Sequence, residues 1–171
     1  ERVAAFYCEP IQGSGGVLVP PAGWMRAMRD LCADLDILFI ADEVITAFGR
    51  TGPLFACADE GIVPDFITTA KGLTSGYVPM GAVFMSDRVY QVIADGAGKA
   101  VVGHGQTYSA HPVSAAVGLA VLDLYLGGLL ENGRIMGERL QAGLATLADH
   151  PLVGDVRGRG MLAAIELVTD K

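Results

Sequence analysis

The stretch Ile37-Leu38-Phe39-Ile40-Ala41-Asp42-Glu43 decides the fold class of this 171-residue chain. Five apolar residues, about the length of a strand, run directly into two carboxylates. A strand that is apolar throughout is buried on both faces, which is typical of a parallel sheet covered by helices. The carboxylates would then lie at the carboxyl end of that strand, where open α/β sheets bind their ligands.

The same pattern recurs along the chain. Further apolar runs of strand length lie at 3–8, 65–69 and 81–85. Helical patterns alternate with them, over about 22–33, 87–94 and 112–147. This alternation predicts an α/β fold with a mainly parallel sheet flanked by helices.

The C-terminal half of the chain carries the signals for helix ends and for a domain boundary. Ser86 is expected to cap the helix that begins at Asp87. The long helical region should break near Gly127-Gly128, and a last strand is expected over 161–168. We therefore assign residues 1–150 to a large domain and residues 151–171 to the start of a smaller one.

Composition narrows the range of functions. The net charge of −7 argues against nonspecific binding to nucleic acid and against docking on an anionic membrane, because both need clustered Lys and Arg. Glycines or charges interrupt the apolar stretches before they reach the length of a membrane span. Three cysteines without C-x-x-C spacing indicate free thiols in a reducing compartment. We expect a cytoplasmic protein and, because the chain starts at Glu1 without Met, part of a longer one.

Two residues at predicted strand ends could carry chemistry. A carboxylate at Asp42 would be partly desolvated and would need a cationic partner, such as a protonated pyridine nitrogen. The alternative is an acidic residue that merely ends a strand at the surface. Lys71 follows the strand 65–69 in a stretch with no other charge, and apolar surroundings favour the neutral, nucleophilic form of an amine. A phosphate-binding lysine is the competing interpretation, but the G-x-x-x-x-G-K-[ST] motif is absent.

A third segment, Gly103-His104-Gly105-Gln106-Thr107-Tyr108-Ser109-Ala110-His111-Pro112, combines hydroxyls with a Gly-rich loop before a helix. Such a loop suits an anion, although an ordinary helix entry has the same composition. The two histidines could suggest a metal. No carboxylate or cysteine stands at ligand spacing from them, so we expect no metal site.

Together these motifs resemble one family. The segments Glu9-Pro10-Ile11-Gln12-Gly13, Asp42-Glu43-Val44-Ile45, Phe48-Gly49-Arg50-Thr51-Gly52, Thr69-Ala70-Lys71-Gly72 and Gly105-Gln106-Thr107-Tyr108-Ser109 occur in the order and spacing of class III, fold-type I transaminases that use pyridoxal 5'-phosphate (PLP). Agreement of several independent motifs over nearly the whole chain is far more specific than any one of them.

The resemblance implies a role for each position. Lys71 would bind PLP as a Schiff base and then move protons, while Asp42 would pair with the pyridinium nitrogen. Val44 would pack on one face of the ring. Thr107 would bind the phosphate held in the neighbouring subunit's site, which implies a homodimer. Glu9 would lie near the substrate.

One position favours a branch of the family. Ornithine- and GABA-type members typically carry Gln after Asp-Glu-Val, and here that residue is Ile45. The apolar residue resembles the omega-amino acid/amine:pyruvate branch, so the expected substrates are a small amino donor and a keto acid such as pyruvate. Arg50 is expected to hold structure rather than substrate.

Other functions stay open. An aminomutase or a decarboxylase would use the same fold and cofactor. A truncated, non-catalytic transaminase lobe is a second alternative, because the family's N-terminal phosphate loop and C-terminal carboxylate-binding arginine are not in this sequence. An unrelated phosphate-binding α/β protein is a third.

Overall fold

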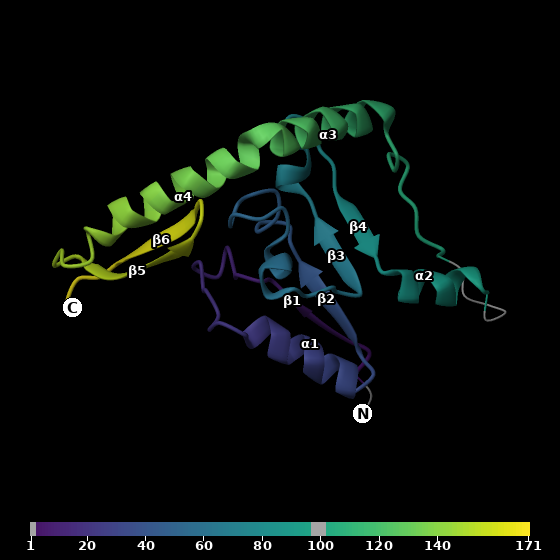
Figure 1. Cartoon of the computed structure of the whole chain (residues 1–171), viewed down its shortest axis with the longest axis horizontal. Coiled ribbons are helices and arrows are strands. Elements are labelled where there is room, and N and C mark those ends of the chain that lie inside the picture. The colour runs from purple at the N-terminus through teal and green to yellow at the C-terminus, as the bar shows by residue number, and fades with distance from the viewer. Residues whose placement is uncertain (1–2, 97–101) are drawn as a thin grey trace.

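A four-stranded sheet forms the centre of the molecule in the computed structural model, which describes residues 3–96 and 102–171 (Figure 1). Its strands follow one another in chain order: β1 (Ala5–Cys8), β2 (Leu38–Asp42), β3 (Phe66–Thr69) and β4 (Ala82–Met85). The first three are parallel, and β4 runs antiparallel to β3. The expected α/β fold with a mainly parallel sheet is confirmed. The connection into β4 holds the short 3-10 turn η2 (Lys71–Thr74) rather than a crossover helix, which accounts for its direction.

The pairing register brings the carboxyl ends of the parallel strands together. Cys8 pairs with Ala41, and Asp42 pairs with Thr68. Residues that follow directly after these strands therefore emerge at one edge of the sheet. This is the edge at which the sequence predicts ligand binding.

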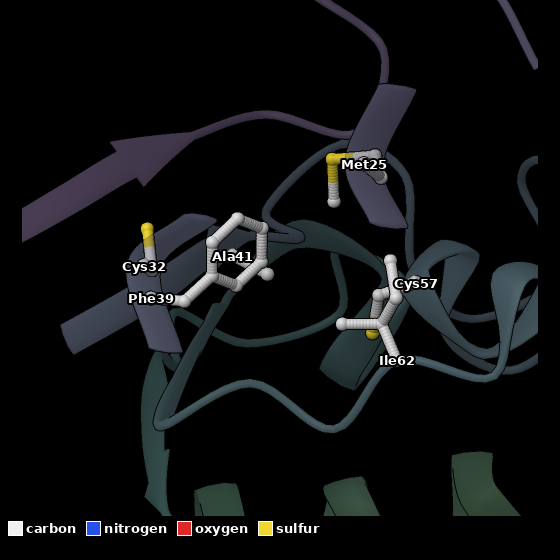
Figure 2. Close-up of a cluster of buried hydrophobic side chains, with 6 residues drawn as sticks. All are labelled: Met25, Cys32, Phe39, Ala41, Cys57 and Ile62. Atoms are coloured by element: carbon white, nitrogen blue, oxygen red, sulfur yellow. The ribbon is translucent and has the colours of Figure 1, made fainter. Parts of the chain in front are cut away.

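One face of the sheet packs on α1 (Trp24–Asp34) (Figure 1). Figure 2 shows the resulting core, in which Phe39 and Ala41 of β2 are fully buried. The other buried members of this cluster are Met25, Cys32, Cys57 and Ile62. The apolar run 37–41 thus forms a central strand because it supplies this core.

The helix after β4, α2 (Asp87–Ala94), begins where the sequence predicts, but its capping was predicted wrongly. The Ser86 side chain makes no capping hydrogen bond. Its hydroxyl is buried and, among the residues that the structure describes, has no hydrogen-bond partner. The backbone carbonyl of Ser86 instead accepts the amides of Val89 and Tyr90.

The long helical segment consists of α3 (Pro112–Leu124), a π turn at Tyr125–Leu129, and α4 (Leu130–Ala145). Gly128 has a φ of 122°, so the expected break lies at the glycine pair. The helix resumes beyond this kink, and an 18-residue window within Pro112–Ala145 has a mean hydropathy of 1.9 with 17% of it buried. By length and composition alone the segment could cross a membrane, although Gly118, Asp123 and Gly127-Gly128 interrupt its apolar run as the sequence predicts. Val121 and Tyr125 of this segment pack into a second core cluster with Phe48 and Leu73.

The chain ends in a two-stranded antiparallel sheet, β5 (Val153–Arg159) and β6 (Leu162–Leu167), which lies along α4 (Figure 1). The sequence predicts only the second strand, because β5 mixes glycines and charges with few apolar residues. The hairpin approaches α4 closely at Gly137, where a Cβ atom would lie 2.8 Å from the backbone of Gly160. The domain division at residue 150 stays a prediction.

Candidate functional site

Lys71 lies just beyond the end of β3, separated from it only by Ala70. Its backbone has a φ of 39°, in the left-handed region that residues other than glycine seldom adopt. Such a conformation costs about 1 kcal/mol and persists only where surrounding structure enforces it. The sequence predicts that the Lys71 side chain lies in apolar surroundings. In the structure this side chain is exposed.

Several contacts hold the turn that carries Lys71. The Tyr125 hydroxyl donates a hydrogen bond of 2.8 Å to the carbonyl of Gly72, and the Thr74 hydroxyl donates one of 2.6 Å to the carbonyl of Val78. A Cβ atom at Gly72 would lie 3.0 Å from the Phe48 ring, so the turn packs directly on the second core cluster. These contacts therefore hold the turn that carries the strained Lys71 in place.

Lys71 borders a cavity of about 380 Å³. Its walls are the apolar side chains of Ile45, Ala47, Phe48 and Tyr125, with Arg50 and the turn Gly72–Gly76 closing the rest. This volume is within the range of small-molecule sites in proteins. Asp42 and Val44 do not line this cavity.

Asp42 is the last residue of β2 and is half-buried. Its carboxylate accepts two hydrogen bonds, from the backbone amide of Val44 to Oδ1 (3.0 Å) and from the Tyr7 hydroxyl to Oδ2 (2.7 Å). Within residues 3–96 and 102–171, no ion pair joins Asp42 to a cation. A half-buried carboxylate in this state has room for a cationic partner.

Asp42 and Lys71 lie at the same edge of the sheet without touching. Asp42 pairs with Thr68 on β3, and Lys71 follows that strand. In the described part of the chain no salt bridge links the two side chains. The edge therefore presents an amine and a carboxylate from neighbouring strands, as the sequence suggests, and whether they converge on one ring-sized gap stays a prediction.

Glu9 follows β1 at the same edge of the sheet. Its Oε2 accepts the backbone amide of Gly13 at 2.9 Å, which closes the turn after β1. A Cβ atom at Gly13 would lie 2.5 Å from the Ile45 side chain, so this turn and the Asp-Glu-Val turn are in contact. Glu9 lines a different hollow from Lys71, of about 230 Å³, together with Trp24 and others.

Thr107 is exposed in a turn closed by a hydrogen bond from the Ser109 amide to the Gln106 carbonyl. Neighbours of Thr107 line a cavity of about 440 Å³ next to Pro79 and Met80. Lys71 does not border this cavity. Five residues of the preceding loop, 97–101, lie outside the described part of the chain.

The functional groups of Asp42 and Lys71 suit the binding of PLP. Asp42 offers carboxylate lone pairs with no competing cation in residues 3–96 and 102–171, and Lys71 offers an exposed amine on a rigid turn. A metal site has no comparable support, because no group of three His, Cys, Asp or Glu in the described residues could hold an ion.

The sequence did not predict the contacts of two residues in this region, Tyr7 and Glu43. Tyr7 looks like one more apolar strand residue, and only the β1–β2 register shows that its hydroxyl reaches Asp42. Glu43 looks like a second surface carboxylate, yet it is fully buried. It accepts hydrogen bonds from Thr46 Oγ1 and from the backbone amides of Ala56 and Cys57. Its uncommon position, a carboxylate just after an apolar run, was the one available signal.

Comparison with known proteins identifies the family to which this fold belongs. The family model "Aminotransferase class-III" matches residues 1–171, and the chain belongs to that family.

Curated relatives of this chain include aminotransferases. A probable aminotransferase of Mycobacterium tuberculosis is 48% identical over 172 residues, which cover all of this chain and 36% of the relative. Putrescine–pyruvate aminotransferase of Pseudomonas aeruginosa is 48% identical over 184 residues, covering all of this chain and 37% of the relative. The chain thus spans little more than a third of the length of these proteins.

Solved structures agree with the fold. The (S)-enantioselective omega-transaminase of Thermomicrobium roseum superimposes with a TM-score of 0.93 at 48% identity, covering 99% of this chain and 38% of that one. A Bacillus anthracis aminotransferase superimposes with a TM-score of 0.94 at 38% identity, over 99% of this chain and 38% of that one.

Proposed function

We propose that the complete protein is a PLP-dependent aminotransferase that transfers an amino group from an omega-amino acid or amine to a keto acid such as pyruvate. The observation that carries this proposal is the position of two residues at one edge of a parallel sheet: a strained lysine, Lys71, and a half-buried carboxylate, Asp42, that forms no ion pair among the described residues. A backbone outlier at a strand end is a mark of functional sites.

The proposed roles follow from what each residue can offer. Lys71 would hold the cofactor through its amine and would then move a proton at the amino-bearing carbon of the substrate. Asp42 would hold the pyridine nitrogen and, as an anion, would favour its protonated form. When bound, PLP supplies an electron sink for the bonds at the amino-bearing carbon. Val44, two residues beyond Asp42 and half-buried, would pack against the ring, as the family resemblance implies.

Two further proposed roles, those of Glu9 and Thr107, involve the substrate and a second subunit. Glu9 lies on the turn that contacts Ile45, and its proposed role is to lie near the substrate. Thr107 would bind the cofactor phosphate of a second subunit, as the family resemblance implies, and in this chain it lines no wall of the Lys71 cavity. The proposal therefore includes a homodimer, located in the cytoplasm as the acidic composition suggests.

The substrate class is the most specific part of the proposal. Ile45 borders the Lys71 cavity and makes that wall apolar, which suits a donor without a second carboxylate there. Putrescine–pyruvate aminotransferase, which is 48% identical to this chain, acts on such a donor by name.

An assay of the complete protein tests the substrate class. PLP, pyruvate and either a terminal diamine or an omega-amino acid should yield alanine, and 2-oxoglutarate should be the poorer acceptor. Release of carbon dioxide, or migration of the amino group without consumption of the keto acid, would instead indicate a decarboxylase or an aminomutase. Absence of bound PLP would indicate a non-catalytic lobe.

A further inference from the structure

The hydroxyl of Tyr7 lies between two polar groups at the edge of the sheet that carries Asp42. It donates a hydrogen bond of 2.7 Å to Asp42 Oδ2. The same oxygen lies 3.1 Å from Thr68 Oγ1. A phenol has one proton, and this proton goes to the carboxylate, so the Thr68 hydroxyl must be the donor in the second bond. The result is a directed chain from Thr68 through Tyr7 to Asp42.

The strand register makes this chain possible. Tyr7 pairs with Ile40 on β2, and Asp42 is the next residue on the same face of that strand. Asp42 in turn pairs with Thr68 on β3. Three neighbouring strands therefore each place one polar side chain on a single face, opposite the face that packs on α1.

The hydrogen bonds of Asp42 divide between its two oxygens. Oδ1 accepts the amide of Val44, and Oδ2 accepts the hydroxyl of Tyr7. A carboxylate has about four lone-pair sites, so each oxygen retains capacity for another donor. Together the two bonds fix the plane of the carboxylate without saturating it.

The electrostatics of Tyr7 agree with this order of donors. The hydrogen bond from Thr68 lowers the pKa of the Tyr7 phenol. Burial, the hydrogen bond to Asp42 and the negative charges of Asp42 and Glu9 raise it, and the net effect is a pKa above the ordinary value. Tyr7 therefore remains a neutral donor to Asp42 throughout the physiological pH range.

We propose that Tyr7 is a positioning residue for Asp42, orienting the carboxylate that receives the cofactor's pyridine nitrogen, with Thr68 orienting Tyr7 in turn. The proposal rests on the function proposed above but adds a residue to which none of the motif positions points. Tyr7 acts through Asp42 and needs no contact with the cofactor.

The first test concerns the hydrogen-bond chain itself and needs no cofactor. In the cofactor-free complete protein, the Tyr7 phenol is titrated by NMR of ¹³Cζ-labelled tyrosine and assigned by its loss in Tyr7→Phe. Asp42→Asn should lower the pKa of Tyr7 by at least about half a pH unit, since it removes a negative charge. Thr68→Val should raise it, since it removes a donor to the phenol oxygen. If the pKa of Tyr7 fails to move in these opposite directions, the proposed chain is overturned, whether or not the protein binds PLP.

The second test asks whether Tyr7 acts through Asp42. Tyr7→Phe should weaken PLP binding about tenfold in the wild-type background, the usual scale for a hydrogen bond to a charged group. In the Asp42→Asn background the same change should alter the dissociation constant less than about twofold. Tyr90→Phe is the matched control, because Tyr90 on α2 is 53% exposed, against 54% for Tyr7, and should leave binding unchanged.

Failure of the proposal and failure of the proposed function look different. Equal losses from Tyr7→Phe in both backgrounds would show a merely structural role and overturn the proposal while PLP binding remains. Tighter PLP binding by Tyr7→Phe would show that Tyr7 competes with the cofactor, which also overturns it. If no variant binds PLP, the proposed function fails, and the titration alone decides whether Tyr7 orients Asp42.

Discussion

The backbone amide of Cys57 donates a hydrogen bond of 2.8 Å to Oε1 of Glu43, a carboxyl group with no exposed surface. Glu43 directly follows Asp42, and its other oxygen accepts the amide of Ala56 and the hydroxyl of Thr46. These bonds attach the turn after β2 to the 3-10 helix η1 (Ala56–Glu60). Glu43 therefore fixes the backbone from which Asp42 and Val44 project.

The first prediction concerns this buried carboxyl. Glu43→Ala leaves three buried donors without a partner and should lower the free energy of unfolding by about 3 kcal/mol or more. Glu43→Gln keeps a carbonyl acceptor and should cost less. Urea denaturation of both variants checks the order. Equal stabilities of Glu43→Ala and wild type would show that the three hydrogen bonds contribute nothing.

The second prediction concerns the contact between α4 and the C-terminal hairpin. Gly137→Ala would place a Cβ atom 2.8 Å from the Gly160 backbone, so the hairpin must move, at a cost of about 1–3 kcal/mol. Gly143→Ala, in the same helix, meets nothing within 4 Å and should stabilise the helix by about 0.5–1 kcal/mol. Thermal unfolding of the pair should shift in opposite directions. A common direction would contradict the packing described here.

The third prediction concerns thiol chemistry. Burial, with a smaller contribution from Cys32, raises the pKa of Cys8 to about 11, and burial also raises the pKa values of Cys32 and Cys57. The thiolate is the reactive form, so all three thiols should react slowly with iodoacetamide at pH 8 and rapidly only after unfolding. Mass spectrometry of time points in native buffer and in urea measures this. Fast labelling of Cys8 at pH 8 in the folded protein would contradict it.

Comparison of the sequence-based predictions with the structure shows which features the sequence could reveal. The apolar run 37–41 predicts β2 because core strands need that composition, and the position of Lys71 follows from the strand before it. The prediction that the Ser86 side chain caps α2 was wrong, because a favourable residue type does not determine where its hydroxyl points in the packed fold. The link between Tyr7 and Asp42 was invisible because it depends on the register of two strands distant in sequence. The strand β5 was missed because its composition is that of a loop, and its pairing with β6 decides its structure.

The fourth prediction concerns Thr107 and its proposed role across a subunit boundary. If each site combines Lys71 of one subunit with Thr107 of the other, a hybrid dimer of Lys71→Ala and Thr107→Ala subunits contains one intact site. At limiting PLP, mixing the two inactive or weakened variants under conditions of subunit exchange should restore up to about half the wild-type activity per hybrid. Each variant alone is the control. No gain on mixing, with exchange verified by mass spectrometry, would show that Thr107 serves the site of its own subunit or none.

The most direct test of the central claim is the identity of the lysine that binds the cofactor. The complete protein is incubated with PLP, treated with sodium borohydride, which converts a carbonyl–lysine linkage into a stable secondary amine, and digested for peptide mapping. The account predicts one pyridoxyl group on the peptide that contains Thr69-Ala70-Lys71-Gly72, unchanged in Lys171→Ala and lost in Lys71→Ala together with transamination. A label on another lysine, or wild-type transamination by Lys71→Ala, would contradict it.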